Sequence, residues 1–175
     1  MKKFLFLLCS LLFSVVGAWA TTPGTLSSTT QITAADQFAD GKLYAVRVNS
    51  GSYITESDGQ YVAPNAQNTI TDEALYSIVP NADGETFTVC NYATHNYWGE
   101  LTGSAVDGTF IPSAEAAGWT FTFNGSNVQA SSGGFYINRS SGVMHGWTTG
   151  INLQIYEVNN IEVNFVTALD ELSNN

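Results

Sequence analysis

From residue 42 onward, hydrophobic residues come in short runs separated by turn-forming residues. The runs are rich in tyrosine, valine, threonine, phenylalanine and isoleucine, and they recur roughly every ten residues. Alternation is clearest in 119–123 (WTFTF), where the apolar side chains fall on one face of an extended chain. The pattern predicts short β-strands and no long helix. Pairs typical of tight turns separate the runs, namely Asp58-Gly59, Asp83-Gly84, Asp107-Gly108, Asn124-Gly125 and Gly133-Gly134.

Twelve such runs divide into three groups of four. The third group is shorter than the first two. The first group covers 43–49, 52–57, 60–65 and 75–80; the second covers 86–92, 96–102, 109–115 and 119–125; the third covers 127–132, 135–140, 142–147 and 152–158.

The three groups also repeat one another in sequence, with a period of about 43 residues. Tyr44 in the first group is matched by Phe87 in the second and by Val128 in the third, shorter copy, while Tyr76 is matched by Trp119. One unit of four short strands is too small to bury its own apolar side, so three units must share a core. Tyr44, Phe87 and Val128 are therefore expected at equivalent positions around one axis. Further matches are Tyr53-Ile54, Tyr97-Trp98 and Tyr136-Ile137.

Three units of four strands resemble a β-trefoil, the family that includes ricin-type lectin domains. The resemblance covers 42–158 and implies an all-β barrel whose closure removes exposed strand edges. The Gln-x-Trp signature of ricin-type lectins has one echo, Gln154-Ile155-Tyr156, with tyrosine in place of tryptophan. The chain thus looks more like the divergent trefoils of exported bacterial carbohydrate-active proteins than like a plant lectin. A β-sandwich is the alternative fold, and it would need no threefold repeat.

Segments outside the repeats predict export. Residues 1–20 combine Lys2-Lys3, an apolar run and Ala18-Trp19-Ala20, as a signal peptide does, and the run is too short to span a membrane. Residues 21–41 are expected to form a flexible leader with one short helical turn, and 159–175 a C-terminal tail. The expected location is the periplasm, the cell surface or the extracellular medium, with no membrane insertion.

Composition narrows the classes of partner. The chain has 15 acidic and 5 basic residues and a net charge of −10, which becomes −12 if Lys2 and Lys3 leave with the signal peptide. Such a surface repels nucleic acid, which is bound by neutralising its phosphates. Cys90 would be the one remaining cysteine, so no disulfide within the chain is expected, and we interpret it as a small structural residue.

The sequence predicts no enzyme. It has no Gly-x-Ser-x-Gly, HExxH or phosphate-loop motif. Cys90 and His95 are five positions apart, but a strand followed by a turn rarely aims two such side chains at one point. Acidic pairs such as Asp72-Glu73 lie in turns, and no cysteine–histidine spacing matches a metal site. We therefore expect no catalysis, no cofactor and no bound metal.

Two clusters combine aromatic rings with hydrogen-bonding groups. The ring faces can stack on sugar C–H groups while polar side chains bond hydroxyls. Tyr97 and Trp98 must point to opposite faces of their strand, so Trp98 either fills the core or meets a ligand. Trp147 either binds a ligand or caps the barrel. The candidate contact residues are His95, Asn96, Trp98 and Glu100 in the second repeat and Arg139, His145 and Trp147 in the third.

The predicted function is that of an exported, non-catalytic carbohydrate-binding module whose partner is a glycan or glycoconjugate. The alternative is a trefoil that binds another protein, or inhibits a protease, through a surface loop. The first hypothesis predicts a shallow pocket lined by tryptophan and polar groups, and the second predicts a protruding loop.

Overall fold

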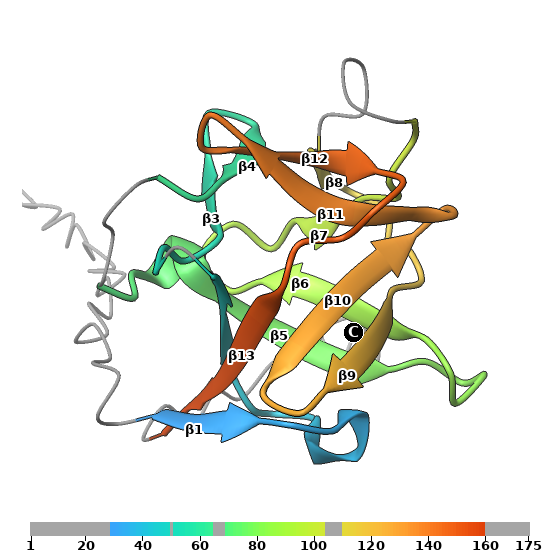
Figure 1. Cartoon of the computed structure of the whole chain (residues 1–175). Helices are drawn as coiled ribbons and strands as arrows, with labels where there is room; N and C mark the ends of the chain where they lie inside the picture. Colours follow the sequence, from blue (N-terminus) through green and yellow to red (C-terminus); the bar gives the residue numbers. More distant parts are fainter. Residues whose placement is uncertain (1–28, 50, 65–68, 104–109, 160–175) are drawn as a thin grey trace, which may run out of the picture.

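The computed structural model describes residues 29–49, 51–64, 69–103 and 110–159, and this part of the chain is all-β (Figure 1). It contains thirteen strands and two 3-10 helices, η2 (Ala35–Gln37) and η3 (Asp72–Ala74). The predicted signal peptide, the first part of the leader and residues 160–175 lie outside the described residues. Within the described residues, no helix has the length and apolar character needed to cross a membrane.

All twelve predicted runs contain a strand, and they follow the predicted order. The runs of the first repeat contain β2 (Tyr44–Val48), β3 (Thr55–Ser57), β4 (Gln60–Val62) and β5 (Leu75–Pro80). Those of the second contain β6 (Phe87–Asn91), β7 (Tyr97–Trp98), β8 (Pro112–Ser113) and β9 (Thr120–Asn124). Those of the third contain β10 (Asn127–Ser132), β11 (Phe135–Ser140), β12 (Val143–Trp147) and β13 (Leu153–Val158).

The first and fourth strands of each repeat form a closed barrel. The pairing runs from β2 through β5 to β6, and from β9 through β10 and β13 back to β2. A bridge between Phe87 of β6 and Trp119, beside β9, closes the circle, with backbone hydrogen bonds of 2.8 and 2.9 Å. The six strands therefore leave no open edge between them, which rules out the alternative β-sandwich.

The register of the barrel confirms the threefold repeat. Within each repeat, the first strand pairs with the fourth at the positions that the sequence period singled out. These pairs are Tyr44 with Tyr76, Phe87 with Trp119, and Val128 with Leu153. Between repeats, a second set of buried pairs joins Val46 to Ile155, Ile78 to Val89 and Phe121 to Ala130.

Three hairpins, β3–β4, β7–β8 and β11–β12, cover one end of this barrel (Figure 1). Each sends one large side chain inward at an equivalent position, and these are Ile54, Trp98 and Ile137. Trp98 has no exposed surface. Its ring lies 5.1–6.1 Å, centroid to centroid, from those of Tyr61, Tyr76, Phe110 and Trp119.

The opposite end of the barrel is filled from the leader. Residues 29–32, which composition assigns to a flexible leader, instead form β1 (Thr29–Ile32), because Ile32 is buried and the strand pairs with β13. The expected helical turn is η2, and the Gln37 side chain accepts hydrogen bonds from the Thr33 and Ala34 backbones at 2.6 and 3.0 Å. Phe38 follows, packed against four aromatic rings at centroid distances of 5.2–6.1 Å.

Gly133, in the β10–β11 turn, has a conformation and surroundings that exclude a side chain. Its φ is +59°, and a Cβ atom there would lie 2.5 Å from the Leu101 carbonyl oxygen and 2.8 Å from the Glu100 carboxylate. Gly125, in the β9–β10 turn, has a φ of +60°, but a Cβ atom at that position would have no described atom within 4 Å. The two glycines thus differ in steric contact but not in backbone strain.

We expect Gly133→Ala to lower the free energy of unfolding by about 1–3 kcal/mol more than Gly125→Ala, because only the former adds a steric overlap. Urea unfolding of both variants measures the difference. Equal losses in the two variants would show that the contact with Leu101 and Glu100 relaxes without cost.

Candidate functional site on the third repeat

The hairpin of β11 and β12 presents an aromatic and polar outer face. Tyr136 pairs with Trp147, and Asn138 pairs with His145. The intervening residue Ile137 is buried against the core, so the two pairs lie on the outer side of the hairpin. The rings of His145 and Trp147 meet edge to face, with centroids 6.1 Å apart. An indole ring and three hydrogen-bonding side chains thus share one surface, which we call the Trp147 face.

Side chains of the barrel and the hairpin hold the loop that follows β12. The Asn138 amide donates a hydrogen bond to the Thr149 carbonyl at 2.9 Å, and the Gln129 amide donates one to the Gly150 carbonyl at 3.2 Å. A Cβ atom on Gly150 would lie 3.2 Å from both the Gln129 and the Tyr136 side chains. The loop therefore packs closely between β10 and the hairpin, and its backbone borders the Trp147 face.

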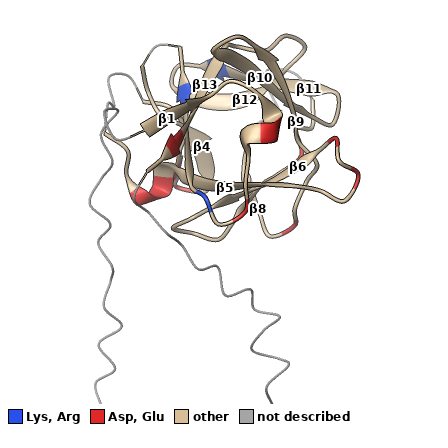
Figure 2. Cartoon of the chain, turned by 90° about the horizontal axis from the view of Figure 1, so that it is seen from below, with Lys and Arg blue, Asp and Glu red and all other residues tan. Residues whose placement is uncertain are grey.

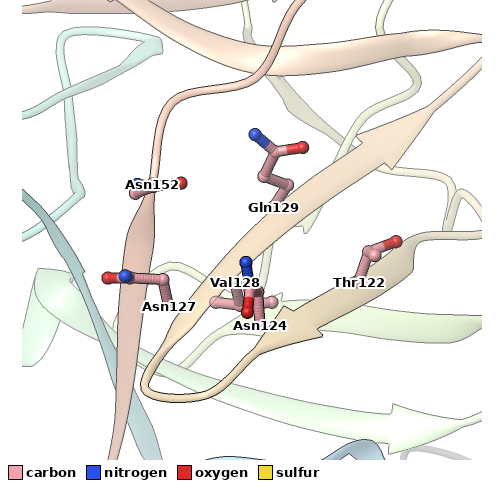
Figure 3. Close-up of a pocket in the computed structure, with 6 residues that line it drawn as sticks. All are labelled: Thr122, Asn124, Asn127, Val128, Gln129 and Asn152. Atoms are coloured by element: carbon pink, nitrogen blue, oxygen red, sulfur yellow. The ribbon is translucent and has the colours of Figure 1, made fainter.

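A shallow hollow of about 220 Å³ lies on the other side of this loop (Figure 3). It is formed on the outside of the barrel by β9, β10 and the residue before β13. Amide side chains dominate its lining, which consists of Thr122, Asn124, Asn127, Val128, Gln129 and Asn152. We call it the amide hollow.

The first two repeats lack the tryptophan. In the second, Ser113 pairs with Tyr97, where Trp147 pairs with Tyr136 in the third. In the first, residues 43–80 contain no tryptophan at all. A hollow of about 390 Å³ instead lies where the second repeat meets Ser132 and Gly133 of the third, and its lining includes Glu100 and Glu115. The aromatic surface is therefore specific to the third repeat.

Comparison with known proteins gives a match in structure alone, since no family model and no curated protein sequence matches the chain. The ricin B-like lectin of Macrolepiota procera, solved in complex with lactose, matches with a TM-score of 0.55 and 14% identity, over 68% of this chain and 97% of that chain. The fold is a β-trefoil. A further solved structure, the Rhizoctonia solani agglutinin, aligns with a TM-score of 0.49 and 14% identity, over 70% of this chain and 89% of that chain.

The second-repeat candidates do not come together on this trefoil. His95 is exposed, and the backbone there adopts a φ of +60°. The Asn96 side-chain amide donates a hydrogen bond to the Glu56 carboxylate at 2.7 Å, and Glu100 lines the hollow of about 390 Å³. The interpretation of Trp98 as a ligand contact is wrong, because its ring is fully buried in the core.

The third-repeat candidates are partly brought together. His145 and Trp147 lie in contact on the outer face. Arg139 pairs with Met144, whose side chain is buried, and so points to the side opposite to the Trp147 face. Sequence reasoning missed Tyr136 and Asn138. The turn signal at Ser141-Gly142 would have revealed both, because it fixes which residues of the hairpin face each other.

Charge is distributed around the trefoil rather than gathered at the site (Figure 2). Acidic residues stand in η2, in η3 and in the turn between β5 and β6. Among the described residues, no three histidine, cysteine or acidic side chains are grouped as a metal site requires. The Trp147 face and the amide hollow contain no carboxylate, so they differ from the rest of this acidic surface.

Cys90 lies on β6, half-buried and opposite Tyr97. Burial raises the pKa of its thiol, and the nearby Glu56 carboxylate raises it further, since both disfavour the thiolate. At neutral pH the thiol is therefore protonated and weakly nucleophilic.

We expect iodoacetamide to modify Cys90 at pH 8 at least about tenfold more slowly than N-acetylcysteine, because the thiolate is the reactive form. The rate should rise with pH, and urea should restore the ordinary rate by exposing the thiol. A folded-state rate equal to that of N-acetylcysteine would contradict this account. Mass spectrometry of the time course gives the rate.

Proposed function

We propose that this protein is an exported, non-catalytic carbohydrate-binding module that binds a glycan through the Trp147 face. The observation that carries the proposal is the placement of Trp147 and His145 beside Tyr136 and Asn138 on the outside of one hairpin. Export rests on the signal-peptide pattern of residues 1–20.

The chemistry of this face suits a sugar. A sugar ring has an apolar side of C–H groups and a rim of hydroxyls. The indole of Trp147 offers a flat apolar surface for the C–H groups, while the His145 and Asn138 side chains offer hydrogen bonds to the rim. Asn138 is held in place by its bond to the Thr149 carbonyl, so its orientation is set before a ligand arrives.

The fold supports the proposal by analogy. The Macrolepiota procera protein of the same fold is a lectin that was solved with lactose bound. Because one fold can serve many functions, the residues of the Trp147 face have to carry the argument for this chain. The net charge of −10 repels anionic glycans from the protein as a whole, and the amide hollow has no basic residue to attract them. Both features favour a neutral glycan.

The second candidate function is protein binding through a loop. Ile111, in the segment before β8, is 52% exposed and is the one large hydrophobic side chain of the described residues that stands out in this way. An exposed isoleucine in a loop is a reasonable protein contact, but a single residue makes a small apolar patch.

A glycan array probed with the protein from residue 21 onward tests the proposal. We expect binding to a restricted set of neutral glycans. Silence across a diverse array would reject carbohydrate binding and favour the protein-binding alternative, which a pull-down with the wild type and with Ile111→Ala would then examine.

A further inference from the structure

We propose that the amide hollow is a second sugar subsite, which receives a neutral sugar unit joined to the one that stacks on Trp147. The inference rests on the proposed function and extends it. It makes the preferred ligand a neutral glycan of at least two units rather than a single sugar.

The floor of the hollow is built by cross-strand pairs of β9 and β10. Thr122 pairs with Gln129, and Asn124 pairs with Asn127, while Val128 between them is buried in the core. The paired side chains therefore project outward from the barrel, as Figure 3 shows, and Asn152 faces them from the segment that enters β13. Five polar side chains thus surround one concave surface of about 220 Å³.

These polar groups are available to a ligand. The side chains of Asn124, Asn127 and Asn152 form no hydrogen bond within the part of the chain that the structure describes. Gln129 uses its amide nitrogen on the Gly150 carbonyl, which fixes the side chain and leaves its oxygen free to accept. One internal hydrogen bond therefore fixes Gln129, and the three asparagine side chains can form hydrogen bonds with a ligand.

Amide side chains select the chemistry of the ligand. Each offers both donors and an acceptor, and a sugar hydroxyl likewise donates and accepts. None of the six lining residues carries a charge. A carboxylate or sulfate group on a sugar would lose its water here without gaining a cation, so acidic sugars are disfavoured. The hollow therefore fits a neutral polyhydroxylated unit.

The hollow adjoins the Trp147 face through Gly150. The position of a Cβ atom on Gly150 is 3.2 Å from Gln129, which lines the hollow, and 3.2 Å from Tyr136, which pairs with Trp147. The residue between the amide hollow and the Trp147 face is therefore a glycine, which adds no side chain between the two. A glycan lying across it meets the tryptophan with one unit and the amides with the next.

The test compares Asn124→Ala/Asn152→Ala with the wild type by isothermal titration calorimetry. Both asparagines are exposed, so the double variant should fold normally, which the melting temperature checks. The probes are galactose with lactose, glucose with cellobiose, and N-acetylglucosamine with chitobiose, together with digalacturonate as the acidic disaccharide.

For the wild type we expect one disaccharide to bind at least about tenfold more tightly than its monosaccharide, since two or more hydrogen bonds are added. The double variant should bind that disaccharide about tenfold more weakly and the monosaccharide unchanged. Trp147→Ala should weaken the binding of both.

Equal affinity of the wild type for monosaccharide and disaccharide, or a double variant that matches the wild type on both, would overturn the second subsite while leaving the Trp147 face as a sugar site. Tighter binding of digalacturonate than of every neutral probe would overturn the choice of a neutral ligand. Failure of the wild type to bind any of the probes or any glycan of the array would instead remove the proposed function, and the subsite with it.

Discussion

Trp147→Ala is expected to weaken binding of the recognised glycan by at least about 30-fold, which corresponds to about 2 kcal/mol. The substitution removes the indole of the Trp147 face, and its cross-strand partner Tyr136 occupies a position of its own and does not replace it. Trp147→Phe keeps a smaller ring and should retain part of the affinity. Calorimetric titration with the best glycan of the array measures both variants.

The matched control is Tyr97→Ala, which removes an aromatic side chain from the corresponding hairpin of the second repeat, where Ser113 stands opposite. It should leave glycan affinity unchanged. A Trp147→Ala variant that binds as tightly as the wild type would place the glycan elsewhere. The larger hollow with Glu100 would then be the next candidate.

Trp98→Ala is expected to lower the free energy of unfolding by about 3–5 kcal/mol, the usual cost of deleting a fully buried large aromatic side chain. Trp98 packs against the rings of Tyr61, Tyr76, Phe110 and Trp119, which come from separate segments of the chain, so no single neighbour can move in to fill the space. Guanidinium unfolding followed by circular dichroism measures the loss.

Trp98→Phe supplies the control, because it keeps most of the ring contacts and should cost markedly less. Trp147→Ala should also cost less than Trp98→Ala, since Trp147 is half-buried. Trp98→Ala should therefore mainly lower stability, whereas Trp147→Ala should mainly weaken glycan binding. A loss below about 1 kcal/mol in Trp98→Ala would mean that the hairpins do not share the barrel core.

The strands and their order could be predicted because the same pattern of apolar runs occurs three times in the sequence. A single short apolar run is ambiguous, but Tyr44, Phe87 and Val128 recur at one spacing and must occupy equivalent places. The register confirms this, since each of the three pairs with the fourth strand of its own repeat. Repetition supplied the information that local propensity lacks.

The facing of individual side chains was harder to predict. Tyr97 and Trp98 alternate on one strand, and period-two alternation alone cannot say which of them is inside. The choice is made by Tyr61, Tyr76, Phe110 and Trp119, distant in sequence, which leave a space that the indole fills.

The amide hollow and β1 were missed for a related reason. Asn152 faces Asn124 and Asn127 only because β13 pairs with β10 in the barrel. The local sequence around Asn152 does not predict that pairing. Residues 29–32 form a polar, threonine-rich stretch in the sequence. They become a strand because they pair with residues 155–158 of β13, beyond the point where β13 pairs with β10 at Leu153. Both features depend on contacts between residues that lie far apart along the chain.

The pairing of β1 with β13 sets Thr29 directly opposite Val158, at the end of the barrel away from the β11–β12 hairpin (Figure 1). Chain entering at Thr29 and chain leaving at Val158 therefore meet at one end of the barrel, while the β11–β12 hairpin, which carries the Trp147 face, lies at the other. A linker joined directly before Thr29 or directly after Val158, whether to a sensor chip or to a neighbouring domain, would leave the hairpin with the proposed glycan-binding face directed away from the point of attachment.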